Sequence, residues 1–203
     1  MKKIVLVLLY LFIFNSAADA LVEVDITRGN LDPLPIAVSP LYIEPGSKEI
    51  KQDGKVIKNI GNEISKVIEV NIRRSGLFNP LKKESFVQNP DIAHAKPRFE
   101  DWRLIKAQAL VTGKVSITDE KLRVEFRLWD VVAAKEMIAL AFSTTPSNWR
   151  RIAHIISDKI YQGLTGEEGY FDTRIIYVSE TGKKTQRYKK LAIMDQDGAN
   201  IKY

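Results

Sequence analysis

Residues 109–128, ALVTGKVSITDEKLRVEFRL, decide the fold of this chain. Apolar and polar residues alternate along residues 109–117 and again along residues 122–128. Successive side chains of a strand point to opposite faces, so each half predicts a strand with one buried face. Asp119-Glu120 provides the turn between them, and the more apolar residues 137–142 predict a third strand. The sequence therefore predicts an antiparallel meander.

Helical periodicity flanks the meander on both sides. Before it, isoleucine and valine recur at spacings of three and four: Ile57, Ile60, Ile64, Val67, Ile68 and Ile72. This spacing gives a helix one apolar face, and Arg73-Arg74 and Gly76 favour its end. After the meander, Ser147 is the expected cap of a second helix that Gly163 and Gly166 end. Its apolar stripe comprises Trp149, Ile152, Ile155, Ile156, Ile160 and Leu164.

Shorter elements complete the expected architecture. The run 36–38 predicts a buried strand, 77–78 and 86–87 predict two short strands, and 98–107 predicts a weaker helix. The runs 175–178 and 191–194 predict two strands, and Asp197-Gly198 predicts a turn after them. The fold class is α/β of the α+β type, with a mixed, largely antiparallel sheet covered by two or three helices.

The amino-terminal residues 1–20 have the pattern of a cleaved secretory signal peptide. Met1-Lys2-Lys3 is basic, residues 4–14 are all apolar, and Ala18-Asp19-Ala20 fits a cleavage site between Ala20 and Leu21. The alternative is an uncleaved membrane anchor, but a helix needs roughly 20 apolar residues to cross a bilayer. We therefore expect an exported protein that is not inserted in a membrane after cleavage.

Composition and charge exclude several classes of function. The net charge of +6 is spread over separate pairs of basic residues rather than gathered in one stripe, which argues against nucleic-acid binding. The chain has no cysteine, which excludes disulfides and thiol chemistry.

The sequence offers little that resembles catalytic or metal-binding chemistry. His154 and Asp158 are expected to form an ordinary surface pair at i,i+4 spacing, with no third ligand at metal spacing, and His94 lies in a proline-rich loop. Neither a G-x-S-x-G motif nor a phosphate-binding loop occurs. Glu167-Glu168 lie in an expected linker, where adjacent side chains point apart. No catalytic, cofactor-binding or metal-binding residue is predicted, and the protein is not expected to be an enzyme.

The segment 164–178, LTGEEGYFDTRIIYV, closely resembles the segment that joins the two domains of the TolB family. The helix end 73–80, RRSGLFNP, resembles the amino-terminal domain of that family, and Asp195, Asp197 and Gly198 resemble a turn in its first propeller blade. TolB is the periplasmic component of the Tol-Pal envelope system of Gram-negative bacteria. The resemblance implies a role in outer-membrane integrity and in envelope constriction during cell division.

The resemblance also implies a domain organisation. Residues 21–34 would be a partner-binding strand and its linker, 35–166 the amino-terminal domain, 167–174 an inter-domain linker, and 175–203 an incomplete first blade of a β-propeller. In the family, the propeller binds the lipoprotein Pal and the mature amino terminus binds the inner-membrane protein TolA. We therefore expect this chain to retain TolA binding, to lack Pal binding, and to be weakly protected after Gly169.

A binding strand is independently suggested by residues 21–28, in which apolar and polar residues alternate: Leu21, Val22, Glu23, Val24, Asp25, Ile26, Thr27 and Arg28. Such a terminal strand can add to the exposed sheet edge of a partner through backbone hydrogen bonds. The alternative is that it is the first strand of its own domain. A further alternative for the whole chain is a secreted enzyme fragment of the propeller-containing peptidase kind.

The signal peptide gives the first testable prediction. The exported product should begin close to Leu21 and be about twenty residues shorter than the gene product, because a signal peptidase cleaves after Ala20. Intact-mass measurement of periplasmic material checks the expected mass. Full-length chain retained in the inner membrane would contradict the cleavage.

Overall fold

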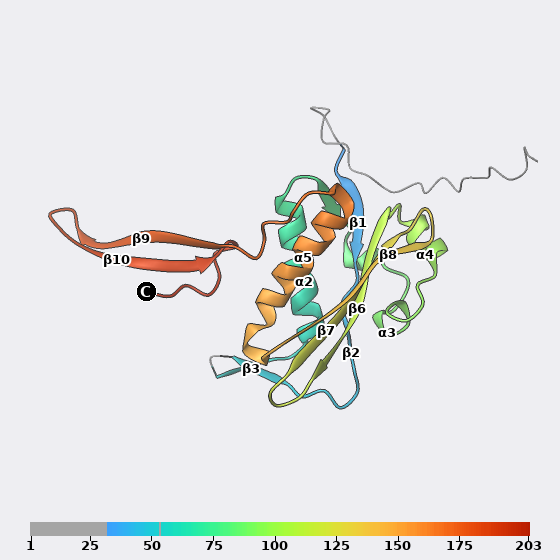
Figure 1. Ribbon diagram of the computed structural model, residues 1–203, viewed down its shortest axis with the longest axis horizontal. Coiled ribbons are helices and arrows are strands. Elements are labelled where there is room, and N and C mark those ends of the chain that lie inside the picture. The colour runs from blue at the N-terminus through green and yellow to red at the C-terminus, as the bar shows by residue number, and fades with distance from the viewer. Residues whose placement is uncertain (1–31, 53) are drawn as a thin grey trace, which may run out of the picture.

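The sheet predicted from the sequence is the centre of the fold (Figure 1). The computed structural model describes residues 32–52 and 54–203. In this part of the chain, six strands form one sheet in the order β5-β1-β6-β7-β8, with β2 paired to β6. Helices cover both faces, and a separate two-stranded hairpin extends from the carboxyl-terminal side. The mixed α+β class is confirmed.

The meander has the expected register. It comprises β6 (Ala109–Ile117), β7 (Leu122–Asp130) and β8 (Lys135–Thr144), all paired antiparallel. Val115 lies opposite Val124, and both are fully buried, as the alternating pattern requires. Strand β8 extends two residues beyond the apolar run 137–142 at each end, and these four residues are polar.

Parallel pairing occurs on the other side of β6. Strand β1 (Leu34–Val38) lies between β5 (Phe78–Pro80) and β6 and is parallel to both, and β2 (Tyr42–Ile43) is also parallel to β6. The last three residues of β1 are all buried because helices cover both faces of this part of the sheet. A small antiparallel hairpin, β3 (Ile50–Gln52) and β4 (Lys55–Ile57), follows β2.

One face of the sheet is covered by α2 (Ile60–Arg74), which carries the predicted isoleucine stripe. From Ile60 onward the stripe is buried, and each buried isoleucine contributes about 1.5–3 kcal/mol by leaving water. The expectation that Ile57 shares the helix is wrong, because Ile57 ends β4. Asn59 caps the helix instead, since its side chain accepts a hydrogen bond from the Asn62 backbone N–H at 3.0 Å.

Helix α5 (Trp149–Thr165) lies beside α2 on the same face. The predicted cap Ser147 is wrong: it lies within the 3-10 turn Pro146–Asn148 that leads into the helix. Gly166 ends the helix in the left-handed conformation, φ +78°, as expected. Gly163 does not end it, because it lies inside the helix, where a Cβ atom would come 2.5 Å from the Ile138 Cδ1.

The opposite face of the sheet is covered by two short helices, α3 (Pro90–Ala93) and α4 (Phe99–Leu104). The predicted helix at 98–107 is therefore confirmed in a shorter form, with Trp102 buried in a second, smaller core. The strand predicted at 86–87 is wrong. Phe86 follows the 3-10 turn Lys83–Ser85 and packs edge-on against Trp102, with ring centroids 5.1 Å apart.

The terminal hairpin consists of β9 (Arg174–Lys183) and β10 (Gln186–Asp195), which confirms and extends the two predicted strands. Its apolar side chains are largely exposed, with Ile176 at 65% and Leu191 at 68%. The expected turn at Asp197-Gly198 is confirmed, with Gly198 at φ +85°. None of the helices in the described residues combines the length and the apolar character that a membrane crossing requires.

The close approach of α2 to the loop after β1 gives the second prediction. Gly61→Ala should destabilise the chain by about 2 kcal/mol or more, because overpacking outweighs the gain in helix propensity of about 1 kcal/mol. A Cβ atom at this position would lie 2.0 Å from the Leu41 carbonyl oxygen. Urea denaturation measures the change. Val70→Ala, at a 43% exposed position of the same helix, is the control and should cost much less.

Candidate functional site at the base of the terminal hairpin

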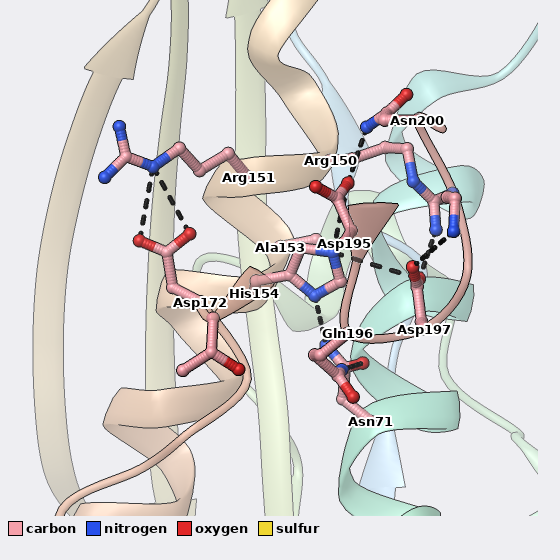
Figure 2. Close-up of polar contacts among 12 residues, drawn as sticks. Asn71, Arg150, Arg151, Ala153, His154, Asp172, Asp195, Gln196, Asp197 and Asn200 are labelled. Atoms are coloured by element: carbon pink, nitrogen blue, oxygen red, sulfur yellow. Dashed lines mark hydrogen bonds and ion pairs between the residues drawn. The ribbon is translucent and has the colours of Figure 1, made fainter. Parts of the chain in front are cut away.

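The partner-binding residues predicted from the sequence, Leu21 to Arg28, and the predicted cleavage site lie outside the described residues. Within residues 32–52 and 54–203, a group of polar side chains gathers where α2, α5 and the turn after β10 meet (Figure 2). We call this group the junction cluster; it comprises Asn71, Arg150, His154, Ser157, Asp195, Gln196 and Asp197.

The turn after β10 is held firmly in the geometry that the cluster needs. The Asp195 backbone N–H donates to the Ala199 carbonyl at 2.9 Å, and the Gly198 N–H donates to the Asp195 carbonyl at 2.9 Å. Lys202 then pairs antiparallel with Ile193, with two backbone hydrogen bonds of 2.9 Å. Gln196 and Asp197 therefore project toward the helices from a rigid loop.

A relay of hydrogen bonds joins this turn to both helices. The Gln196 side-chain amide donates to the Asn71 Oδ1 at 2.9 Å. The Asn71 Nδ2 group has two hydrogens, one directed to the His154 Nδ1 at 2.9 Å and one to the Ser157 Oγ at 2.9 Å. The Ser157 hydroxyl donates in turn to the Ala153 carbonyl at 2.8 Å. Because Asn71 donates on this side, the His154 Nδ1 must be an acceptor and Nε2 must carry the proton.

Charged groups surround the protonated nitrogen. The His154 Nε2 lies 3.8 Å from an Asp197 carboxylate oxygen and 3.9 Å from an Asp195 oxygen, and it has no hydrogen-bond partner. Arg150 forms an ion pair with Asp197, and Asn200 donates to Asp195. Burial lowers the pKa of His154 below its ordinary value, although both carboxylates oppose that shift. His154 is therefore neutral at pH 7.

The geometry is superficially that of a metal site, since His154, Asp195 and Asp197 offer ligand atoms within 4.8 Å of one another. Two observations argue against a metal ion. A metal would need the lone pair of Nε2, but the Asn71 donor fixes the proton on that nitrogen. The Arg150 guanidinium also already neutralises Asp197. The arrangement is better suited to hold two parts of the chain together.

The segment 167–174 makes a second attachment. Phe171 is only 1% exposed and belongs to the main core. The Asp158 carboxylate accepts hydrogen bonds from the Phe171 and Asp172 backbone N–H groups, at 2.6 and 3.1 Å. Asp172 forms an ion pair with Arg151 (Figure 2). The segment is therefore packed against α5, whereas the weak protection expected after Gly169 stays a prediction.

The surface pairing of His154 with Asp158 predicted from the sequence is also wrong. His154 is 2% exposed and faces α2 and the terminal turn, whereas Asp158 binds backbone N–H groups of the following segment. One signal in the sequence could have found the cluster. Asn71 falls three and four residues after Ile68 and Val67, so it lies on the buried face of α2, where an unpaired amide would be costly.

A hollow of about 500 Å³ lies on the face of the meander that α2 and α5 do not cover. It is lined by Arg123, Arg127 and the small residues Ala139 and Ala141. The arginines are paired with glutamates, and His94 stacks on Tyr42 with ring centroids 4.4 Å apart. The arginines and the histidine of this hollow therefore already have partners within the protein, and we assign no ligand to it.

Comparison with known proteins decides the family. The family profile of the TolB amino-terminal domain matches residues 22–137. The chain belongs to this family. It is 68% identical, over 98% of its length, to the Tol-Pal system protein TolB of Pelagibacter ubique (strain HTCC1062). It also superimposes on the crystal structure of TolB from Acinetobacter baumannii with a TM-score of 0.66 and 25% identity, over 89% of this chain.

The match covers only part of each relative. This chain spans 45% of the Pelagibacter protein and 40% of the Acinetobacter chain. The structural match covers 89% of the chain, whereas the family profile covers only residues 22–137. The TolB fold inferred from the sequence is thus supported by both sequence and structure.

The relay gives the third prediction. Asn71→Leu should destabilise the chain by about 2–4 kcal/mol, because it leaves buried partners on three sides without their hydrogen bonds. Thermal and urea denaturation followed by circular dichroism measure the loss. The control Asn79→Leu makes the same change at an exposed strand position and should cost about 0.5 kcal/mol or less. Equal effects of the two changes would mean that the relay contributes no stability.

Proposed function

We propose that this chain acts in the periplasm as a protein-interaction component of the Tol-Pal envelope system. The observation that carries the proposal is its 68% identity, along nearly its whole length, to a protein named for that system. The sequence pattern of residues 1–20 adds support, because it is that of an export signal. In this role the chain supports outer-membrane integrity and envelope constriction during division.

We further propose that residues 21–28 bind TolA by adding a strand to its sheet. Three observations support the assignment. The segment has strand periodicity, the family profile begins within it at residue 22, and the described sheet places β1 centrally between β5 and β6. Both neighbours of β1 are therefore occupied by other strands, so the segment is not required to complete that part of the core.

We propose that residues 174–195 by themselves do not bind Pal. The resemblance assigns the Pal contact to propeller blades, and a blade is a four-stranded sheet that is stabilised by its neighbours. Residues 174–195 form one hairpin whose apolar side chains are exposed. The alternative of a secreted peptidase fragment gains no support, because the buried His154 faces Asn71 and two carboxylates rather than a nucleophile.

The fourth prediction tests TolA binding. Val24→Pro should weaken the affinity about 100-fold, corresponding to roughly 3 kcal/mol, because it removes a ladder N–H and restricts the preceding residue. Val24→Thr should weaken it only a few-fold, since threonine keeps the strand preference. Calorimetric titration of the purified chain with TolA measures both variants, and Pal in the same experiment should not bind.

Deletion of residues 21–27 separates the two interpretations of the segment. If it is a partner-binding strand, the deletion abolishes TolA binding and leaves the circular-dichroism melt unchanged. If the deletion unfolds the domain, the segment is part of its own sheet and the proposal is wrong. Tight Pal binding by the intact 203-residue chain would overturn the assignment of that contact to the propeller.

A further inference from the structure

We propose that the junction cluster is a proton-sensitive latch, in which the neutral His154 holds the terminal hairpin on α2 and α5 and its protonation releases the hairpin. The inference goes beyond the proposed function, since it concerns how the two parts of this chain are held together. It rests on the direction of each hydrogen bond in the relay and on the charges that face the imidazole ring.

The relay as it stands fits the neutral form of His154 in which Nδ1 is unprotonated. With Nδ1 unprotonated, both links of the relay, from Gln196 to Asn71 and from Asn71 to the His154 Nδ1, join a donor to an acceptor. Asn71 is 0% exposed and His154 2% exposed, so both side chains are removed from bulk solvent. Satisfied in this way, the network fixes the turn after β10 on both helices at once.

Protonation of Nδ1 puts two donors face to face. The imidazolium directs an N–H toward the Asn71 Nδ2 group, which lies 2.9 Å away and has hydrogens of its own. Rotation of the Asn71 amide would give His154 an acceptor, but it would also turn N–H groups toward the Gln196 Nε2 and an oxygen toward the Ser157 Oγ, so that both of those side chains would have to reorient. Protonation of His154 therefore disturbs the hydrogen bond between Asn71 and Gln196, which attaches the turn after β10 to α2.

Some of the charges around the ring raise the pKa of His154 and others lower it. From the terminal turn, Asp195 and Asp197 attract an imidazolium, and Asp172 adds a weaker attraction from the segment before β9. From α5 itself, Arg150 repels it and Asp158 lies one turn on, while α2 contributes the uncharged Asn71. Burial outweighs the carboxylates, so the pKa of His154 in the docked state lies below its ordinary value of 6.5.

The sign of the pH dependence follows from this depressed pKa. Well above pH 6.5 the ring is neutral whether the hairpin is docked or released, and docking has its full strength. As the pH falls through 6.5, a ring that release exposes to solvent takes up a proton that the buried, docked ring takes up less readily, so acid favours release. One titrating group changes the ratio of released to docked chains by at most about tenfold per pH unit.

The fifth prediction is tested by spin-label distances, because the chain has no native cysteine. Lys184→Cys at the hairpin tip and Lys66→Cys on the exposed face of α2 carry the two labels. At pH 7.5 the distance distribution should be narrow. Between pH 6.5 and 5.0 a broad component should grow, with the ratio of released to docked chains rising by up to about tenfold per pH unit.

Two variants make the assignment specific to His154. His154→Gln keeps an acceptor for Asn71 and a donor toward the carboxylates but does not titrate, so its distribution should stay narrow to pH 5.0. His94→Gln is the matched control, because His94 is the only other histidine and lies away from the cluster; this variant should behave as the unmodified chain does. In addition, the imidazole ¹⁵N shifts of the unmodified chain at pH 7.5 should report the proton of His154 on Nε2.

The proposal is overturned by any of three results. A narrow distribution that persists to pH 5.0 in the unmodified chain would show that protonation does not release the hairpin. The same broadening in the His154→Gln variant would assign release to another titrating group. A proton on Nδ1 at pH 7.5 would reverse the relay, and this measurement decides the matter even if the variant fails to fold.

Discussion

The packing of α2 against α5 is the contact on which the rest of this structure depends. The apolar stripes of the two helices meet over one face of the sheet and supply 12 of the 27 buried residues of the main core. The same contact carries the polar relay, because Asn71 and His154 lie on the facing sides of these helices. If the helices moved apart, the core would open and the attachment of the hairpin would be lost with it.

The carboxyl-terminal part of the chain combines firm and weak attachment. Phe171 is buried in the core, and the turn after β10 is bonded to both helices, whereas the far end of the hairpin exposes its apolar side chains. The orientation of the hairpin thus depends on a few polar contacts at its base rather than on apolar burial along its length. Polar contacts of this kind respond to protonation, whereas apolar burial does not.

Much of the fold could be predicted from the chain, because periodicity reports burial directly. The alternation along residues 109–128 predicted β6 and β7, and the spacing from Ile60 to Ile72 predicted α2. The predictions were wrong at residues whose type fits one local pattern but which the fold uses in another way. Ile57 fits the helical stripe but ends β4, and Gly163 has the residue type of a helix end but instead allows α5 to approach Ile138.

The sequence by itself determined the family, the sheet, the two long helices and the export signal pattern, since each is carried by local residue order. Only the tertiary structure decided the junction cluster. His154 and Asp158 have the spacing of a surface pair, yet the fold buries one against Asn71 and turns the other to the Phe171 backbone. Asn71 and Gln196 are separated by 125 residues, so local periodicity contains no information about their contact. Their pairing exists because α2 and α5 pack side by side and leave a polar position at the point where the chain returns.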